Sequence, residues 1–216
     1  VALGNGSQKK ILEDISAMGT NTISIFPGSG FGDRRSGRIK TLTIADAKVI
    51  AQQSYVASAT PQTTSSGTLT YRNTDLSASL YGVGEQYFDV RGLKLESGRL
   101  FDEADVKEDA QVVVIDQNTK EKLFGTDVDP LGKTVLFKKR PLTVIGVMQK
   151  EENSFGNSDV LMLWSPYTTV MHQITGESHT NSITVKIKND ANTQVAEKGL
   201  TELLKTRHGT EDFFMN

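Results

Sequence analysis

The stretch VLMLWSPYTTVMHQITG at residues 160–176 predicts a strand followed by a helix. Val160–Trp164 is a short apolar run, which is typical of a buried strand. Ser165 and Pro166 are residue types that begin helices as the N-cap and the first helical residue. Gly176 is a residue type that ends them. This stretch therefore predicts a strand–helix unit in a layered fold.

Similar elements are expected on both sides of this unit. Ser182–Lys188 alternates apolar and polar residues, as a strand with one buried face does. Val195, Leu200, Leu203 and Leu204 mark an amphipathic helix, and His208 near its end is a cation that suits the helix dipole. Thr43 and Asp46 match an approximate capping box at the start of an earlier helix. The predicted strands are 22–26, 56–60, 68–71, 78–83, 112–115, 134–137, 142–147, 160–164 and 182–188, and the predicted helices are 11–18, 43–53, 116–124, 165–175 and 195–208. The order of strands and helices predicts an α+β fold, with helices on one face of a sheet.

A change of composition in the middle of the chain predicts two subdomains. Between residues 87 and 157 the charges are denser, and the strands are short and β-branched. We expect residues 87–157 to form an inserted small α/β subdomain. Residues 1–86 and 158–216 would form a discontinuous subdomain built from two βαβ-like halves.

Composition and charge exclude several classes of function. The 216 residues contain 24 basic and 26 acidic side chains, for a net charge of −2, so a strongly basic surface for nucleic acid is excluded. The absence of cysteine excludes disulfides, zinc–thiolate sites and cysteine nucleophiles. No run of 18 apolar residues and no signal sequence occurs. The chain starts without methionine and ends on an apolar segment, so we expect it to be part of a longer protein.

The motifs that suggest catalysis or ligand binding lack their partners. Gly28–Gly32 follows a strand, but loop residues stand where a phosphate-binding helix would begin. Ser7–Lys10 matches S-x-x-K without the motifs that accompany it in penicillin-recognising enzymes. The histidines show no metal-ligand spacing. We predict no catalytic, cofactor-binding or metal-binding residues, which leaves a binding or coupling domain.

A series of short motifs then gives a more specific indication. In order along the chain they are Met18-Gly19-Thr20-Asn21-Thr22-Ile23 before Pro27-Gly28, Gly84-x-x-Tyr87-Phe88, Gly98-Arg99-x-Phe101, Leu123-Phe124-Gly125, Pro130-Leu131-Gly132-Lys133, Val144-Ile145-Gly146-Val147, Phe155-Gly156, Pro166-Tyr167-Thr168-Thr169 and His208-Gly209-x-x-Asp212-Phe213. Together they resemble the periplasmic core domain of the MacB macrolide exporters, a family of ABC transporters. The resemblance spans nearly the whole chain.

The resemblance implies a periplasmic domain of a bacterial inner-membrane protein, lying between the first and second of four membrane helices. The ATPase domain, which binds ATP and magnesium, would precede it in the same polypeptide, so the fragment itself would be no enzyme. The resemblance also implies that the subdomain formed by both chain ends, 1–86 and 158–216, is porter-like and carries the smaller α/β insert. Family members are dimers that work with a MacA-type periplasmic adaptor and a TolC-type outer-membrane duct. In them, ATP hydrolysis drives periplasmic movement that expels cargo. The alternative is a non-transport relative that releases lipoproteins or activates a cell-wall hydrolase.

Two sets of residues are expected to carry the interactions. Aromatic residues at the predicted subdomain junction would line a substrate cleft, unless they belong to the core, and the resemblance places two of them near that cleft. The strands at 134–137 and 142–147 would form a hairpin with residues 138–141 as its basic tip. The charged residues of this tip and of an acidic stretch in the insert would contact the adaptor, unless they are merely solvated. The cleft residues are Tyr87, Phe88 and Phe155, and the adaptor residues are Lys138, Lys139, Arg140, Asp102 and Asp105. We expect the isolated domain to be a monomer or to self-associate weakly, because no heptad pattern is visible.

Overall fold

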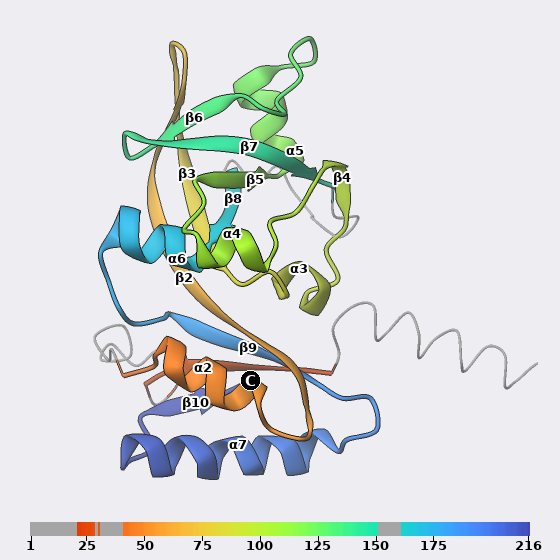
Figure 1. The fold of residues 1–216 in the computed structure, drawn as a ribbon, viewed down its shortest axis with the longest axis vertical. Coiled ribbons are helices and arrows are strands. Elements are labelled where there is room, and N and C mark those ends of the chain that lie inside the picture. The colour runs from red at the N-terminus through yellow and green to blue at the C-terminus, as the bar shows by residue number, and fades with distance from the viewer. Residues whose placement is uncertain (1–20, 29, 31–40, 151–160) are drawn as a thin grey trace, which may run out of the picture. The chain divides into compact units, whose positions relative to one another are not determined.

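The structure is a computed structural model that describes residues 21–28, 30, 41–150 and 161–216 (Figure 1). The predicted α+β fold is confirmed. The described strands form one mixed sheet of ten strands in the order β10-β1-β9-β2-β3-β8-β5-β7-β4, and β6 pairs with β2 and β7. The predicted helix at 11–18 and the predicted cleft residue Phe155 lie outside the described residues.

The chain divides into two compact units. Unit 1 consists of Val1–Thr60, Gln86–Gly92 and Ser182–Asn216, and unit 2 consists of Pro61–Glu85 and Leu93–Asn181. These units differ in extent from the predicted segments. Residues 61–85 and 161–181 join the middle of the chain in unit 2, because β8 pairs there with β5 and β2 pairs with β6, while β3 pairs with both β2 and β8. The subdomain boundaries at 87 and 157 therefore stay a prediction from composition.

Unit 1 is a small sheet with helices on it. Its elements are β1 (Thr22–Pro27), α2 (Ile44–Ala51), the start of β2 (Val56–Tyr71), α3 (Tyr87–Val90), β9 (Ser182–Ile187), α7 (Thr193–His208) and β10 (Phe213–Met215). Strand β1 pairs antiparallel with both β9 and β10. Helices α2 and α7 contribute to one apolar core with β1 and β9, including the fully buried Ile25, Ile50 and Leu200. Figure 1 shows α2 in orange and α7 in blue.

Helix α2 begins at its predicted cap and ends at Ala51, two residues before the predicted end, whereas α7 ends at His208 as predicted and begins at Thr193, two residues before the predicted start. Thr43 and Asp46 form the predicted capping box of α2, because the Thr43 hydroxyl accepts the Asp46 N–H and the Asp46 carboxylate accepts the Thr43 N–H. At α7, Asn192 accepts the N–H groups of Gln194 and Val195, and Gly209 follows the last helical residue. The expected core residue Val195 is 67% exposed, so its place on the apolar face was wrong.

Strand β9 is buried on both faces, which the sequence did not indicate. Its apolar residues contact α2 and α7, but Ser182 and Thr184 on the opposite face are also buried. Helix α3 packs against β9, and Lys186 Nζ lies 3.3 Å from Asp89 Oδ2 of that helix. The alternation therefore predicted the strand correctly and the solvent-facing side wrongly.

Unit 2 contains the remaining elements. They are the rest of β2, β3 (Thr74–Val83), β4 (Leu95–Gly98), α4 (Glu103–Lys107), β5 (Val112–Ile115), α5 (Gln117–Thr119), the π-helical segment η2 (Lys120–Phe124), β6 (Thr134–Phe137), β7 (Arg140–Met148), β8 (Leu161–Pro166), α6 (Tyr167–Thr169) and the π-helical segment η3 (Val170–Thr175). Strands β3 and β8 run parallel, as do β5 and β7. The pairs β2–β3, β2–β6, β4–β7, β5–β8 and β6–β7 are antiparallel. Leu80, Val113, Phe137 and Leu163 are fully buried in its core.

Two local predictions in unit 2 differ from the structure. The separate strands expected at 56–60 and 68–71 are one long strand, β2, because its ladder with β3 begins at Gln62, just after Pro61. Ser165 does not cap a helix, since it is fully buried in β8 and donates its hydroxyl to the Val112 carbonyl at 2.7 Å. The helix instead begins after Pro166, which makes no side-chain cap.

Candidate functional site

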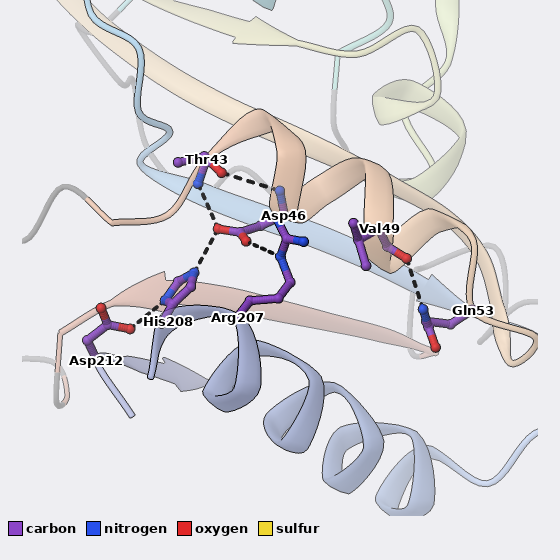
Figure 2. Close-up of polar contacts among 7 residues, drawn as sticks. All are labelled: Thr43, Asp46, Val49, Gln53, Arg207, His208 and Asp212. Atoms are coloured by element: carbon purple, nitrogen blue, oxygen red, sulfur yellow. Dashed lines mark hydrogen bonds and ion pairs between the residues drawn. The ribbon is translucent and has the colours of Figure 1, made fainter. Parts of the chain in front are cut away.

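A buried ionic cluster lies in unit 1, where the first turn of α2 meets the last turn of α7 (Figure 2). The Asp46 side chain is only 2% exposed and is held by three donors. Its Oδ1 accepts Arg207 Nε at 2.8 Å, and its Oδ2 lies 2.8 Å from His208 Nε2 and 3.0 Å from the Thr43 nitrogen. The carboxylate therefore joins two helices that are distant in sequence.

His208 extends the cluster to the segment before β10. Its Nδ1 lies 2.6 Å from Asp212 Oδ1, and Figure 2 shows the ring between the two carboxylates. The Asp212 carbonyl accepts the N–H of Gly28, the residue after β1, at 2.7 Å. The ring of Phe213 stands edge-on to the imidazole, with the ring centres 6.0 Å apart. The four charged residues of this network, Asp46, Arg207, His208 and Asp212, are called the corner cluster below.

Helix geometry explains why these residue types stand here. Asp46 lies in the first turn of α2, where the unpaired N–H groups favour a negative charge. Arg207 and His208 lie in the last turn of α7, where the unpaired carbonyls favour a positive charge. The positive end of α2 therefore carries a carboxylate and the negative end of α7 carries two cations, and these side chains link the two helix ends.

The cluster shifts the pKa of each carboxylate and of the imidazole. Burial raises the pKa of Asp46, but hydrogen bonds from Arg207, His208 and Thr43 outweigh it and lower the pKa below its ordinary value. The pKa of Asp212 is also lowered, because the Thr41 hydroxyl and His208 outweigh its burial. Burial lowers the pKa of His208, but Asp212 and Asp46 outweigh it and raise the pKa. The cluster thus favours its charged forms.

The arrangement is suited to holding elements together rather than to catalysis. Both ring nitrogens of His208 are engaged by carboxylates, so neither can accept a proton from a substrate without a rearrangement. Among the residues that the structure describes, no group of three or more His, Cys, Asp or Glu side chains could hold a metal ion. Within the same residues, no helix is long and apolar enough to span a bilayer.

The structure buries the two described aromatic residues of the expected cleft. Tyr87 is 5% and Phe88 1% exposed. Their rings meet edge to face with centres 5.8 Å apart, and Arg91 lies over the Tyr87 ring at 5.8 Å. Neither ring is presented to solvent in this conformation, which differs from the exposed aromatics expected at a hinge. A role of Tyr87, Phe88 and Phe155 in cargo contact stays a prediction.

Replacing Tyr87 with alanine is expected to lower the free energy of unfolding by about 3 kcal/mol, because truncating a buried aromatic leaves a cavity. Urea denaturation of the 216-residue chain measures this effect. Tyr81→Ala is the matched control, since Tyr81 is only half-buried and should cost less. A loss below about 1 kcal/mol for Tyr87→Ala would instead favour the cleft role over the core role.

The expected basic tip of a hairpin is present in unit 2. Phe137 pairs with Arg140, so Lys138 and Lys139 form a two-residue turn between β6 and β7. All three basic side chains are exposed. Both lysines adopt positive φ angles, 48° and 67°. In two-residue turns this conformation is preferred by Gly, Asn and Asp and is unfavourable for lysine. Pro141, predicted to lie in the tip, is part of β7.

The tip is supported by strand β2 of the same unit. The Lys138 N–H donates to the Thr68 carbonyl at 3.1 Å. A Cβ at Gly67 would lie 2.7 Å from Lys138 Cγ and 2.8 Å from its Cε, so the lysine stem occupies the space that a side chain at 67 would fill. The basic tip is therefore a built feature with a fixed base.

The two acidic residues expected at the adaptor surface have structural partners. Asp102 and Asp105 form a capping box at the start of α4, and Asp105 Oδ2 lies 2.8 Å from Arg99 Nη1. The hydrogen bond from Arg99 lowers the pKa of Asp105. Their charges are thus partly neutralised within the domain, and among the described residues they form no hydrogen bond or ion pair with the basic tip.

Sequence reasoning missed the corner cluster as a unit. Asp46 was identified as a capping residue and His208 as a helix-end cation, but nothing local links them, since they are 162 residues apart. The spacing His208-Gly209-x-x-Asp212 was the available signal. A histidine at the end of a helix, with an aspartate four residues later across a glycine, places both side chains on one turn.

Comparisons with known proteins agree on one family. The family model of the MacB-like periplasmic core domain matches residues 1–203. The chain is 88% identical, over all of its 216 residues, to the macrolide export ATP-binding/permease protein MacB of Neisseria meningitidis serogroup A, and 56% identical to that of Aggregatibacter actinomycetemcomitans. It covers 33% of each relative, so the chain spans about a third of their length.

Solved structures show the same fold. The crystal structure of the periplasmic region of MacB from Actinobacillus actinomycetemcomitans matches with a TM-score of 0.85 and 54% identity, covering 96% of this chain and 93% of that one. The extracellular domain of the noncanonic ABC-type transporter YknZ matches with a TM-score of 0.76 at 24% identity, covering 91% of this chain and all of that one, which shows the fold alone. The chain belongs to the family of MacB-like periplasmic core domains, the periplasmic portion of an inner-membrane transporter.

Proposed function

We propose that this domain couples ATP hydrolysis in the cytoplasm to movement in the periplasm, in an exporter that works as a dimer with a MacA-type adaptor and a TolC-type duct. The observation that carries the proposal is the 88% identity over the whole chain to a macrolide export protein that is three times as long. ATP and magnesium would be bound by the part of the protein outside this chain. In this reading the domain transmits force and docks partners, and it performs no chemistry itself.

The connectivity of the two units supports transmission. The polypeptide passes between them four times, at 60/61, 85/86, 92/93 and 181/182. Strand β2 itself runs without interruption from unit 1 into unit 2. A movement imposed on unit 1 would therefore reach unit 2 through several chain segments rather than through one flexible linker.

The basic tip is the surface that we propose for the adaptor. Lys138, Lys139 and Arg140 are exposed, and both lysines hold backbone conformations that cost of order 1 kcal/mol each. Conformations of this kind are often found at sites of recognition. Exposed charges of one sign fix the register of a complex and speed association more than they add affinity. An acidic surface on the adaptor would be the complement.

Charge reversal at the tip tests this docking. In the full-length transporter, Lys138→Glu with Lys139→Glu is expected to weaken adaptor binding about tenfold, because each exposed ion pair is worth up to about 1 kcal/mol and two are lost. Co-purification and surface plasmon resonance measure binding, and growth in a macrolide measures export.

The matched control is Lys188→Glu with Lys198→Glu, which makes the same change of charge on exposed lysines of unit 1. It should leave binding within twofold. Equal binding by both double variants would contradict docking at the tip. A wild-type transporter that retains no adaptor and gives no resistance would contradict the export function, and would favour lipoprotein release or hydrolase activation instead.

A further inference from the structure

The corner cluster contains one imidazole between two carboxylates. His208 Nε2 lies 2.8 Å from Asp46 Oδ2, and His208 Nδ1 lies 2.6 Å from Asp212 Oδ1. A neutral imidazole carries a proton on one nitrogen only, whereas the imidazolium carries one on each. Because ionised carboxylates only accept hydrogen bonds, both short contacts can be hydrogen bonds at once only when His208 is protonated.

The charges around the ring balance in the protonated state. Among the described residues, α2 contributes Asp46, the segment before β10 contributes Asp212, and α7 contributes Arg207, whose Nε lies 2.8 Å from Asp46 Oδ1. The more exposed Lys205–Glu211 pair, at 3.5 Å, carries no net charge. Two carboxylates and two cations give a neutral cluster, and loss of the proton leaves one uncompensated negative charge in a largely buried place.

From this geometry we propose that His208 is a protonation-dependent latch that holds the start of β10 to the ends of α7 and α2. When the ring loses its proton, the contact with Asp212 opens first. The latch is a feature of the fold of unit 1, and it stands independently of the adaptor and the cargo.

The two carboxylates differ in what they retain without His208⁺. Asp46 is 2% exposed, and Arg207 and the Thr43 N–H hold its carboxylate in place, so it cannot turn toward water. The one proton of the neutral ring is therefore best placed on Nε2, where it is donated to Asp46. The lone pair of Nδ1 then faces Asp212 Oδ1, which is repulsive. Asp212 is 15% exposed and can turn toward water, since its remaining side-chain partner is the Thr41 hydroxyl.

Opening at Asp212 would loosen the pairing of β10 with β1. The Asp212 carbonyl accepts the Gly28 N–H, and the next residue, Phe213, is 4% exposed and pairs with Pro27. Strand β10 is only three residues long, so it depends strongly on how its first residue is fixed. Local opening of this kind is cheapest in short elements at a sheet edge.

The pKa shifts set the pH window of the latch. Burial lowers the pKa of His208, but Asp212 and Asp46 raise it by more than burial lowers it, so the net shift is upward. The protonated ring therefore contributes its full stability below the ordinary pKa of histidine, and this contribution is lost as the pH rises through the raised pKa. Asp46 and Asp212 have lowered pKa values, so their contribution is full above the ordinary value and is lost as pH falls through the lowered ones. The latch is closed between these limits.

Amide hydrogen exchange of the 216-residue chain between pH 6 and 9.5 tests the latch. The N–H groups of Ser24 and Asn216 donate to each other's carbonyls across β1 and β10, and the Gly28 N–H donates to the Asp212 carbonyl just before β10. The protection factors of these three amides are expected to fall by up to about tenfold per pH unit above the pKa of His208. The Ile187 N–H, which donates to the Asn21 carbonyl, should keep its protection. Constant protection of Ser24, Gly28 and Asn216 over this range would overturn the proposal.

Two variants separate the latch from a general effect of pH. Asp212→Asn provides an amide donor to the neutral ring, so the pH dependence of β10 should largely disappear. His172→Gln is the matched control, because His172 is exposed and meets only one carboxylate, Asp109, at 2.8 Å. It should leave the dependence unchanged. An undiminished dependence in Asp212→Asn would contradict the proposal.

A direct observation of the ring keeps the test independent of folding of the variants. The ¹⁵N chemical shifts of the His208 imidazole in the wild-type chain report the proton on each nitrogen. Both nitrogens should be protonated at pH 6, below the ordinary pKa of histidine, because the pKa of His208 is raised. A single protonated nitrogen at pH 6 would overturn the latch, whatever the variants do.

Discussion

Replacing Asp46 with alanine is expected to lower the free energy of unfolding by about 3–5 kcal/mol, the usual result of removing one partner of a buried ion pair. The loss leaves the Arg207 cation without its carboxylate and leaves His208 with Asp212 alone, in a place where the Asp46 side chain is only 2% exposed. The same change removes one of the two bonds of the capping box of α2, because the Thr43 N–H loses its acceptor while the Thr43 hydroxyl still accepts the N–H of residue 46. Urea denaturation at pH 7, with a check that the slope stays constant, measures the effect.

Asp105→Ala is the matched control for this prediction. Asp105 has the same place in a capping box, at α4, and it also pairs with an arginine at 2.8 Å. It differs in that Arg99 is 53% exposed and no histidine takes part. We expect this variant to cost about 1 kcal/mol, as a cap with an exposed ion pair does. Equal losses in the two variants would show that the burial of the corner cluster adds nothing.

How much of the fold was predictable depended on how local each cause is. The capping box of α2 lies within four residues, and its sequence signal was sufficient. The apolar run of β5 and the basic hairpin tip were likewise found from neighbouring residues. Strand β2 was predicted as two strands, 56–60 and 68–71, and the stretch between them contains Pro61 and Gly67, residue types that disfavour strands. Both are accommodated by partners, β3 and Lys138, that no window of sequence contains.

The candidate site shows the same limit more strongly. The residues of the corner cluster are individually ordinary, and their meaning arises only when α2 and α7 bring positions 46 and 208 together. The sequence left open whether Tyr87 and Phe88, which stand at a change of composition, line a cleft at a hinge or belong to the core. Their burial follows from α3 joining unit 1, a three-dimensional relation that composition does not encode.

The motifs that carried the resemblance owe much of their character to packing. Phe88 and Phe101 are 1% and 2% exposed, so they are core residues. His208 and Asp212 belong to the corner cluster. A family can thus be recognised from residues whose role is to hold the fold, and this is why the motifs identify the domain more clearly than its contacts with cargo or adaptor.

Replacing Gly98, the glycine of the motif Gly98-Arg99-x-Phe101, with alanine is expected to lower the free energy of unfolding by about 3–5 kcal/mol. Gly98 ends β4 with φ +80°, which strains any residue with a side chain. A Cβ there would also lie 2.2 Å from the Ile145 carbonyl oxygen and 2.9 Å from Gly146 Cα, both backbone atoms of β7. The backbone of β7 would have to move away and lose the 2.8 Å hydrogen bond from the Arg99 N–H to that oxygen.

Gly132→Ala separates the clash from the strain. Gly132 has nearly the same φ, +82°, but a Cβ there would meet nothing within 4 Å. This variant should cost only the backbone strain, about 1–2 kcal/mol. Urea denaturation of both variants gives the difference, which is the contribution of the close approach of β4 to β7. Losses that agree within about 0.5 kcal/mol would mean that β7 yields to the new methyl group without cost, contrary to the packing described here.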